Sequence, residues 1–265
     1  MKVKERALVV SSEQLTEDIR SLILKVSFAS EVRAGQFVNL FRSDESRLLP
    51  RPISICSVDA KAGQIRLVYR IAGSGTLEFS GLSAGDSISV MGPLGNGFPI
   101  EETAGKRVLL VGGGIGIPPM LSCAEAIAGR SASGERAASV TAALGYRTAD
   151  LYLYDEIKEK AEVCVSTDDG SFGVHGTVLD AVRAAGVQPE LIFACGPKVM
   201  LRAVRDYASE TGCRAYVSME ERMACGVGVC LGCVTDTTET DAHSLVKRAR
   251  VCADGPVFPA EEVVL

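Results

Sequence analysis

Four cysteines near the C-terminus are the residues of this chain best suited to metal chemistry. Cys225, Cys230 and Cys233 have the spacing C-x4-C-x2-C, and Cys252 follows after eighteen further residues. Four thiolates at this plant-type spacing hold the two irons of a [2Fe–2S] cluster. The pattern therefore predicts such a cluster, with these four cysteines as its ligands.

Three glycines in the same stretch, Gly226, Gly228 and Gly232, favour the cluster over a structural zinc site. Glycine reaches positive φ without steric cost, so the backbone can wrap around a cluster and aim N–H groups at its sulfurs. Zinc also binds four cysteines, but zinc sites usually combine two C-x2-C pairs. Here one such pair is followed by a single distant cysteine, so zinc remains the alternative and a disulfide framework is less favoured.

Two arginine-containing segments in the first hundred residues suggest a dinucleotide site. A guanidinium pairs well with a pyrophosphate, and N–H groups at the start of a short helix can face a phosphate. Ser54 could also donate to a flavin nitrogen. The alternatives are that Arg51-Pro52 only marks the edge of a strand and that Arg70 is a solvated strand residue. The segments are Arg51-Pro52-Ile53-Ser54 and Val68-Tyr69-Arg70, the second running into a turn that contains Gly75 and Thr76.

A second glycine-rich segment joins a buried strand to a helix with prolines in its first turn. Its glycines are Gly112, Gly113, Gly114 and Gly116. They would let a pyrophosphate approach the helix N-terminus, although the sequence is not the G-x-G-x-x-G fingerprint. A tight turn between strand and helix is the alternative.

Polar residues that follow later strands predict the rest of a nicotinamide dinucleotide site, because ligands bind at the carboxyl edge of open α/β sheets. Asp168 or Asp169 could accept from a ribose hydroxyl and repel a 2′-phosphate, which favours NAD over NADP, although Asp-Asp-Gly is also ordinary turn chemistry. Cys195 could lie near the nicotinamide, or it could be a buried structural cysteine. Glu220 could face the same side. His175 and His243, the two histidines, are in no nucleophile–base arrangement.

The elements that must position these residues change character near residue 101. Before it, short apolar runs broken by Gly, Asp, Ser and Pro predict an antiparallel sandwich or small barrel. After it, strands alternate with helices, which predicts βαβ units and a parallel sheet. The predicted domains are 1–100, 101–219 and 220–265, with a short extended tail over Pro256–Leu265. The strands expected in the first domain are Ala7–Ser11, Ile19–Ser27, Gln36–Phe41, Pro52–Val58, Gln64–Arg70 and Ser87–Met91.

The composition describes an ordinary globular protein. The chain has 265 residues, 47% hydrophobic and 23% charged, which suits about two domains. A net charge of −5 and a pI near 5.3 argue against nucleic acid as the main partner. The sequence has no 18-residue apolar run that would suggest a membrane span and no apolar N-terminal region that would suggest a signal peptide. We therefore expect a cytoplasmic location.

The complete order of motifs resembles the ferredoxin–NADP reductase superfamily. It consists of R-P-I-S, G-S-G-T, G-G-G-I-G-I-P-P, C-G-P and the cysteine loop. The segment S-M-E-E-R-M-A-C-G-V-G-V-C-L-G-C and the later C-A-D-G-P-V-F are similar to the electron-transfer subunits of B-type, NAD-dependent dihydroorotate dehydrogenases. The resemblance extends along essentially the whole chain.

This resemblance implies FAD in an N-terminal β-barrel, NAD(H) in the α/β domain and a [2Fe–2S] cluster in the C-terminal loop. In the family, a separate FMN-containing subunit oxidises dihydroorotate in pyrimidine biosynthesis, and electrons pass through the cluster and FAD to NAD⁺. The implied assembly is a hetero-oligomer with two copies of each chain. Where the superfamily has a tyrosine in R-x-Y-S this chain has Ile53, so no aromatic side chain is expected to stack on the flavin there. The residues carried over as FAD contacts are Arg51, Pro52, Ile53, Ser54, Val68, Tyr69, Arg70, Gly75 and Thr76.

Other functions are compatible with the same motifs. A related NADH-dependent subunit could serve ferredoxin, polysulfide or hydrogenase partners, because such relatives share both nucleotide domains. From other classes, the chain could be a regulatory sensor of iron or redox state, or a zinc-stabilised scaffold. Iron, sulfide and flavin contents of the purified chain separate these possibilities.

Overall fold

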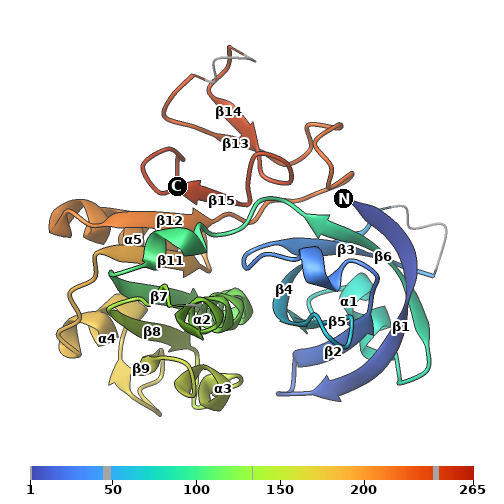
Figure 1. The fold of residues 1–265 in the computed structure, drawn as a ribbon, viewed down its shortest axis with the longest axis horizontal. Coiled ribbons are helices and arrows are strands. Elements are labelled where there is room, and N and C mark those ends of the chain that lie inside the picture. Colours follow the sequence, from blue (N-terminus) through green and yellow to red (C-terminus); the bar gives the residue numbers. More distant parts are fainter. Residues whose placement is uncertain (1, 44–48, 133, 241–244) are drawn as a thin grey trace.

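The computed structural model describes residues 2–43, 49–132, 134–240 and 245–265, so His243 lies outside the described residues. Figure 1 shows three parts: a β-barrel, a sheet flanked by helices, and a C-terminal segment that lies across the top of both. This arrangement confirms the predicted combination of an antiparallel barrel with a parallel α/β sheet and a C-terminal cysteine loop.

The N-terminal strands close into a barrel in the order β1-β2-β5-β4-β3-β6. Each strand pairs with a neighbour on both sides, so closure leaves no free sheet edge and selects the barrel over the sandwich. All six expected strands are present, several of them longer than predicted, and a short helix, α1 (Ser74–Ser80), follows β5. The strands are β1 (Val3–Gln14), β2 (Ile19–Lys25), β3 (Phe37–Phe41), β4 (Arg51–Asp59), β5 (Gln64–Arg70) and β6 (Ser87–Leu94).

The second sheet has seven strands in the order β10-β9-β8-β7-β11-β12-β15, parallel from β10 to β12. Its central strands β7 and β11 are buried almost throughout, as expected when helices cover both faces. The strands are β7 (Arg107–Gly113), β8 (Ser139–Tyr146), β9 (Glu162–Thr167), β10 (Val174–His175), β11 (Leu191–Cys195) and β12 (Arg214–Ser218). The helices are α2 (Ile117–Ala132), α3 (Tyr154–Lys158), α4 (Val178–Ala184) and α5 (Lys198–Thr211).

Helix α3 begins only at Tyr154, although apolar residues already precede it at Leu151 and Leu153. Leu153 has φ of 62°, in the left-handed region, and therefore breaks the helix before Tyr154. Leu151 and Tyr152, which lie before the helix, are apolar because they pack against the core.

Apolar side chains of the barrel and the α/β domain join in one cluster at their interface, and the barrel interior forms a separate cluster. Helix α2 packs against β4, and buried Cys56 of β4 belongs to the same cluster of apolar side chains as Leu121 of α2. Across this interface Arg66 of β5 donates to Glu156 of α3 at 2.5 Å, and within the barrel it also donates to Ser21 of β2 at 2.9 Å. The two domains are therefore held against each other by apolar burial and an ion pair.

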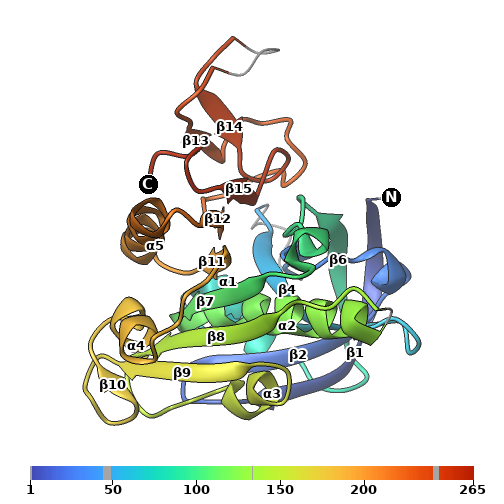
Figure 2. The ribbon, with the colours of Figure 1, turned by 60° about the vertical axis from the view of Figure 1, so that its left-hand side comes forward.

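The C-terminal segment returns to both domains. Strands β13 (Val234–Asp236) and β14 (Arg248–Arg250) form an antiparallel hairpin above the sheet, as Figure 2 shows. The tail predicted as extended contains β15 (Val257–Pro259), which pairs antiparallel with β12. Asn96, after the last barrel strand, accepts from Val257 N at 3.1 Å and donates to the Asp254 carbonyl at 2.8 Å. Within the described residues, no helix combines the length and apolarity needed to cross a membrane.

Candidate electron-transfer site

A cavity of about 330 Å³ lies where the barrel, the α/β domain and the C-terminal segment meet. The barrel side contains six of the residues predicted to contact FAD, and the opposite side is formed mainly by the segment that leads to the cysteine loop. Barrel residues at the cavity are Phe37, Pro52, Ile53, Ser54, Val68, Tyr69, Arg70 and Ala72, and facing them are Ile115, Ser218, Met219, Glu220, Met223 and Pro256.

Tyr69 gives the cavity a polar group that the protein does not satisfy. Its side chain is 2% exposed, and its hydroxyl has no hydrogen-bond partner among the described residues. Burial raises the pKa of Tyr69 to about 12, so the phenol is neutral. Leaving such a hydroxyl unpaired costs about 1–3 kcal/mol. A ligand with polar atoms, such as the flavin, would remove this cost, and the lining therefore fits the group.

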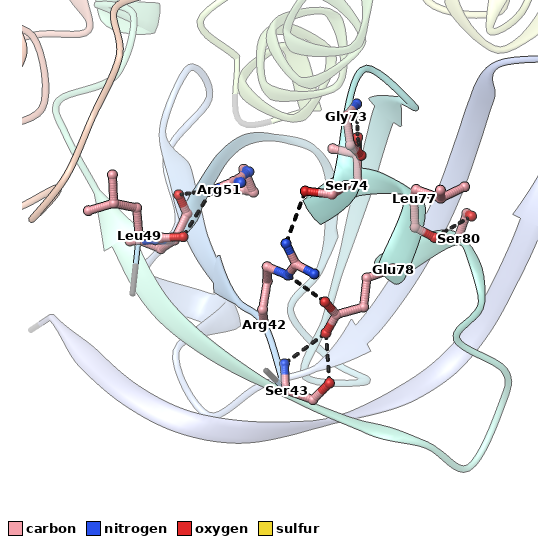
Figure 3. A network of polar contacts seen from close by, with 11 residues as sticks. Arg42, Ser43, Leu49, Arg51, Gly73, Ser74, Leu77, Glu78 and Ser80 are labelled. Atoms are coloured by element: carbon pink, nitrogen blue, oxygen red, sulfur yellow. Dashed lines mark hydrogen bonds and ion pairs between the residues drawn. The ribbon is translucent and has the colours of Figure 1, made fainter. Parts of the chain in front are cut away.

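Arg51 provides the positive charge of the predicted pyrophosphate site. Its guanidinium donates to the carbonyls of Leu49 at 2.9 Å and Pro50 at 3.3 Å (Figure 3), and no acidic partner is found for it in the described part of the chain. A Cβ on Gly75 would lie 2.6 Å from Arg51 Nε, so the glycine allows the guanidinium to reach the start of α1. Thr76 Oγ1 accepts from Ala72 N at 2.9 Å and shapes this turn.

A second arginine near α1 was missed by the sequence reasoning. Arg42 Nε donates to Glu78 at 2.5 Å and its Nη1 donates to Ser74 Oγ at 3.0 Å, as Figure 3 shows. Partial burial opposes the charge of Glu78, but hydrogen bonds from Ser43 and Arg42 lower the pKa of its carboxyl. The pair joins the end of β3 to α1 and is separated by 36 residues in sequence. No sequence motif links residues that are so far apart, so the pair could not be predicted.

The glycines at the end of β7 and in the turn that follows serve protein packing as well as any ligand. A Cβ on Gly113 would lie 2.5 Å from Met200 Sδ, and one on Gly116 would lie 2.1 Å from the Cys195 carbonyl. Gly112 packs on the first turn of α2 in the same way. Gly114 is different: it has φ of 52°, more open space, and a carbonyl that accepts from Tyr152 Oη at 2.5 Å.

The two aspartates after β9 have different surroundings. Asp169 Oδ1 accepts from Ser171 N at 3.0 Å and Oγ at 2.6 Å, and these hydrogen bonds lower its pKa. Its carboxylate is thus used to stabilise its own turn. Asp168 is exposed, and its carboxylate has no partner among the described residues, so it is the one available to a ligand. Since β8 separates β9 from β7, about 10 Å lie between Asp168 and the Gly114 turn.

Cys195 lies behind the cavity wall rather than in it. The residue is 1% exposed, and burial raises its thiol pKa far above the usual range. Ser218, its neighbour in the β11–β12 register, lies beside Cys195 and lines the cavity. Cys195 itself does not line the cavity, whereas Ser54, which was predicted to donate to a flavin nitrogen, lines it directly.

Glu220 is a further ionisable group at the cavity. It is accessible from the open cavity but surrounded by protein on most other sides; this desolvation raises its pKa against the opposing charge of Arg70. Its position immediately after Met219 at the end of β12 supports the expectation that it faces the same side as Ser218.

The four cysteines of the C-terminal loop form two pairs. Cys230 is the neighbouring thiol that influences the pKa of Cys225, and Cys233 is the one that influences the pKa of Cys252, whose backbone N–H donates to Cys233 Sγ at 3.4 Å. Within the described ranges no three His, Cys, Asp or Glu side chains converge on one ion position. A tetrahedral zinc site needs all four sulfurs about 2.3 Å from one ion, whereas a binuclear cluster divides them into two pairs. The donor set thus fits the [2Fe–2S] group better than zinc.

The backbone of the cysteine loop favours thiolates. Burial opposes ionisation of Cys225, but N–H groups of Val227, Cys230 and Val229 lower its pKa to about 6. The thiolate is the metal-binding form of cysteine.

Positive φ at Gly226 (68°) and Gly228 (88°) allows the backbone to wrap around the cysteine thiols, as predicted. Gly232 has no positive φ; Leu231, with φ of 55°, adopts that conformation instead.

Comparison with known proteins assigns both halves of the site. Residues 6–98 match an oxidoreductase FAD-binding domain, and residues 220–264 match the iron–sulfur cluster binding domain of dihydroorotate dehydrogenase B. A protein of Listeria monocytogenes serotype 4a (strain HCC23), named dihydroorotate dehydrogenase B (NAD(+)), electron transfer subunit, is 42% identical over 259 residues, 97% of each chain. The chain belongs to this family of electron transfer subunits.

Other members and one solved structure agree with the assignment. The electron transfer subunit of Bacillus cereus (strain G9842) is 39% identical over 269 residues, the whole of both chains. A chain of the NADH-dependent reduced ferredoxin-NADP oxidoreductase superposes with a TM-score of 0.85 at 30% identity, covering 97% of this chain and 89% of that one. The predicted oxidoreductase class, FAD and iron–sulfur cluster are thereby confirmed for this electron transfer subunit.

Proposed function

We propose that this chain is the electron-transfer subunit of an NAD⁺-dependent dihydroorotate dehydrogenase in pyrimidine biosynthesis. The observation that carries the proposal is the position of Met223, which lines the cavity and lies two residues before Cys225. The same short segment thus forms one wall of the flavin cavity and begins the cluster loop. When bound, FAD supplies both hydride exchange with NAD(H) and single-electron exchange with an iron–sulfur cluster.

The protein residues bind and orient these groups. Arg51, with Gly75 and Thr76 at the start of α1, would hold the FAD pyrophosphate by charge-assisted hydrogen bonds. Ser54 and Tyr69 would hydrogen-bond the flavin end from the cavity wall.

On the other side of the cavity, the Gly114 turn would approach the NAD pyrophosphate, with Gly112, Gly113 and Gly116 packing behind it. The free carboxylate of Asp168 would accept from the adenosine ribose.

The proposed partner is an FMN-containing catalytic subunit, in an assembly with two copies of each chain. Cys230 is exposed, and beside it Val229 and Leu231 are 80% and 63% exposed. Apolar side chains of this size around a cluster ligand suit a protein contact better than water. A cytoplasmic location belongs to the proposal, since all nine cysteines are free thiols.

The decisive experiment combines this chain with an FMN-containing dihydroorotate dehydrogenase subunit under anaerobic conditions. We expect dihydroorotate-dependent reduction of NAD⁺ only when both chains are present, with iron, sulfide and FAD each bound to this one. The matched comparison replaces the catalytic subunit by ferredoxin, because the solved ferredoxin-NADP oxidoreductase is similar over nearly the whole chain. Activity with ferredoxin and none with the FMN subunit would refute the proposal.

A further inference from the structure

Asn39 is a fully buried polar residue between the flavin cavity and the cluster loop. It is 0% exposed and lies in β3, where it is paired with Pro52 of β4 and Met91 of β6. Pro52 lines the cavity, and so does Phe37, which precedes Asn39 by two positions in β3. Asn39 is therefore built into the strands that form the flavin side of the site.

The side chain of Asn39 reaches the backbone of a cluster ligand. Its Nδ2 donates to the Cys225 carbonyl at 3.5 Å, across 186 residues of sequence. The next residue is fitted to this contact, because a Cβ on Gly226 would lie 2.2 Å from the same Nδ2. Gly226 is thus required both by its φ of 68° and by the close approach of Asn39.

The other atom of the amide shows that packing alone does not explain the residue. Asn39 Oδ1 is buried and has no hydrogen-bond partner among the described residues. A leucine of similar volume would avoid the cost of burying this acceptor. The feature that leucine lacks is the N–H donor, and this donor points at Cys225.

We propose that Asn39 is a positioning residue for the cluster: its amide fixes the Cys225 carbonyl against the flavin-binding strands and thereby sets the reduction potential of the cluster. The proposal rests on the electron-transfer function given above and adds a residue to it. Hydrogen-bond donors and polar surroundings stabilise the more negative, reduced form of an iron–sulfur cluster. Replacing the amide by an apolar side chain removes a donor dipole next to a ligand, so the potential should fall.

The test is a potentiometric titration of the cluster in the full-length holoprotein, with dithionite as reductant and electron paramagnetic resonance as the readout. For Asn39→Leu we expect the one-electron reduction equilibrium to become at least tenfold less favourable, which corresponds to about 59 mV. We also expect altered g-values. The matched control is Thr103→Val, which removes a hydroxyl of equal burial whose hydrogen bond among the described residues goes to the Ile100 carbonyl, at 2.7 Å.

A second variant is needed in case Asn39→Leu fails to assemble its cluster. Asn39→Ser is too short to reach Cys225 and leaves room for water, so it should retain iron and show a shift in the same direction. An unchanged or raised potential with unchanged g-values, in a variant with full iron content, would overturn the proposal. Loss of iron from both variants would overturn it as well, because Asn39 would then be needed for the fold of the loop. A wild-type chain that binds its cluster but does not react with NADH would refute the proposed function and leave this test intact.

Discussion

Replacing Arg51 by alanine tests the FAD site most directly. Its guanidinium lies against Gly75 at the start of α1 and donates only to carbonyl oxygens in the described part of the chain, so its charge is available to a phosphate. A hydrogen bond to a charged group contributes about 1.5–3 kcal/mol. With about 1.4 kcal/mol for each factor of ten, Arg51→Ala should weaken FAD binding roughly 10- to 150-fold.

The measurement is a fluorescence titration of the deflavinated protein with FAD at two salt concentrations. The wild-type affinity should fall with added salt, and the variant should lose part of this dependence, because a charge–phosphate contact is screened. Arg6→Ala is the matched control: it removes the same charge from the same barrel, where Arg6 donates to Ser87 on the neighbouring strand. An Arg51→Ala dissociation constant within about threefold of the wild-type value, or equal losses in both variants, would show that the reasoning about the pyrophosphate is wrong.

Three further predictions concern the cluster, the coenzyme and the domain interface. Cys252→Ser should abolish the visible absorption of the cluster while Cys213→Ser retains it; an unchanged spectrum in the first variant removes that ligand. Asp168→Ser should raise the use of NADPH relative to NADH by about tenfold, since a repelled 2′-phosphate regains about 1.4 kcal/mol, whereas Asp169→Asn should leave the preference unchanged; the reverse order in steady-state kinetics would contradict the assignment. Burial, together with a neighbouring carboxylate, raises the pKa of Glu125. The contribution of Glu125 to stability is therefore fully present below about pH 4.3 and is lost as the pH rises through its raised pKa. The unfolding temperature should thus decline less steeply with pH in Glu125→Gln than in the wild type. Parallel plots of unfolding temperature against pH for the two proteins would contradict this.

Much of the fold was predictable because the local patterns are unambiguous. Short runs between turn residues gave the six barrel strands, and strand–helix alternation gave the parallel sheet. The ends of the helices and strands were less predictable. For example, α3 begins only after Leu153, and the spacing of apolar residues does not reveal the left-handed backbone of this leucine. The pairing of β15 with β12 was also missed, since a three-residue strand is defined by its partner and not by its own sequence.

The candidate site divides in the same way. The residues of R-P-I-S and V-Y-R were predicted from their chemistry, and all of them except Arg51, which lies against Gly75, line one cavity. The ion pair of Arg42 with Glu78 and the cavity position of Ser218 were not predicted, because each depends on elements that meet only after folding.

The sequence by itself determined which chemistry this protein can perform. The spacing of the four cysteines and the glycines between them predicts a cluster, and this spacing can be seen without knowledge of the fold. The tertiary structure alone decided where that chemistry takes place: the cavity with Met223 on its wall, the thiol of Cys195 behind Ser218, and the amide of Asn39 on the Cys225 carbonyl. The physical reason is that packing of the barrel, sheet and C-terminal segment brings together residues as far as 186 positions apart, and no local pattern encodes such a meeting.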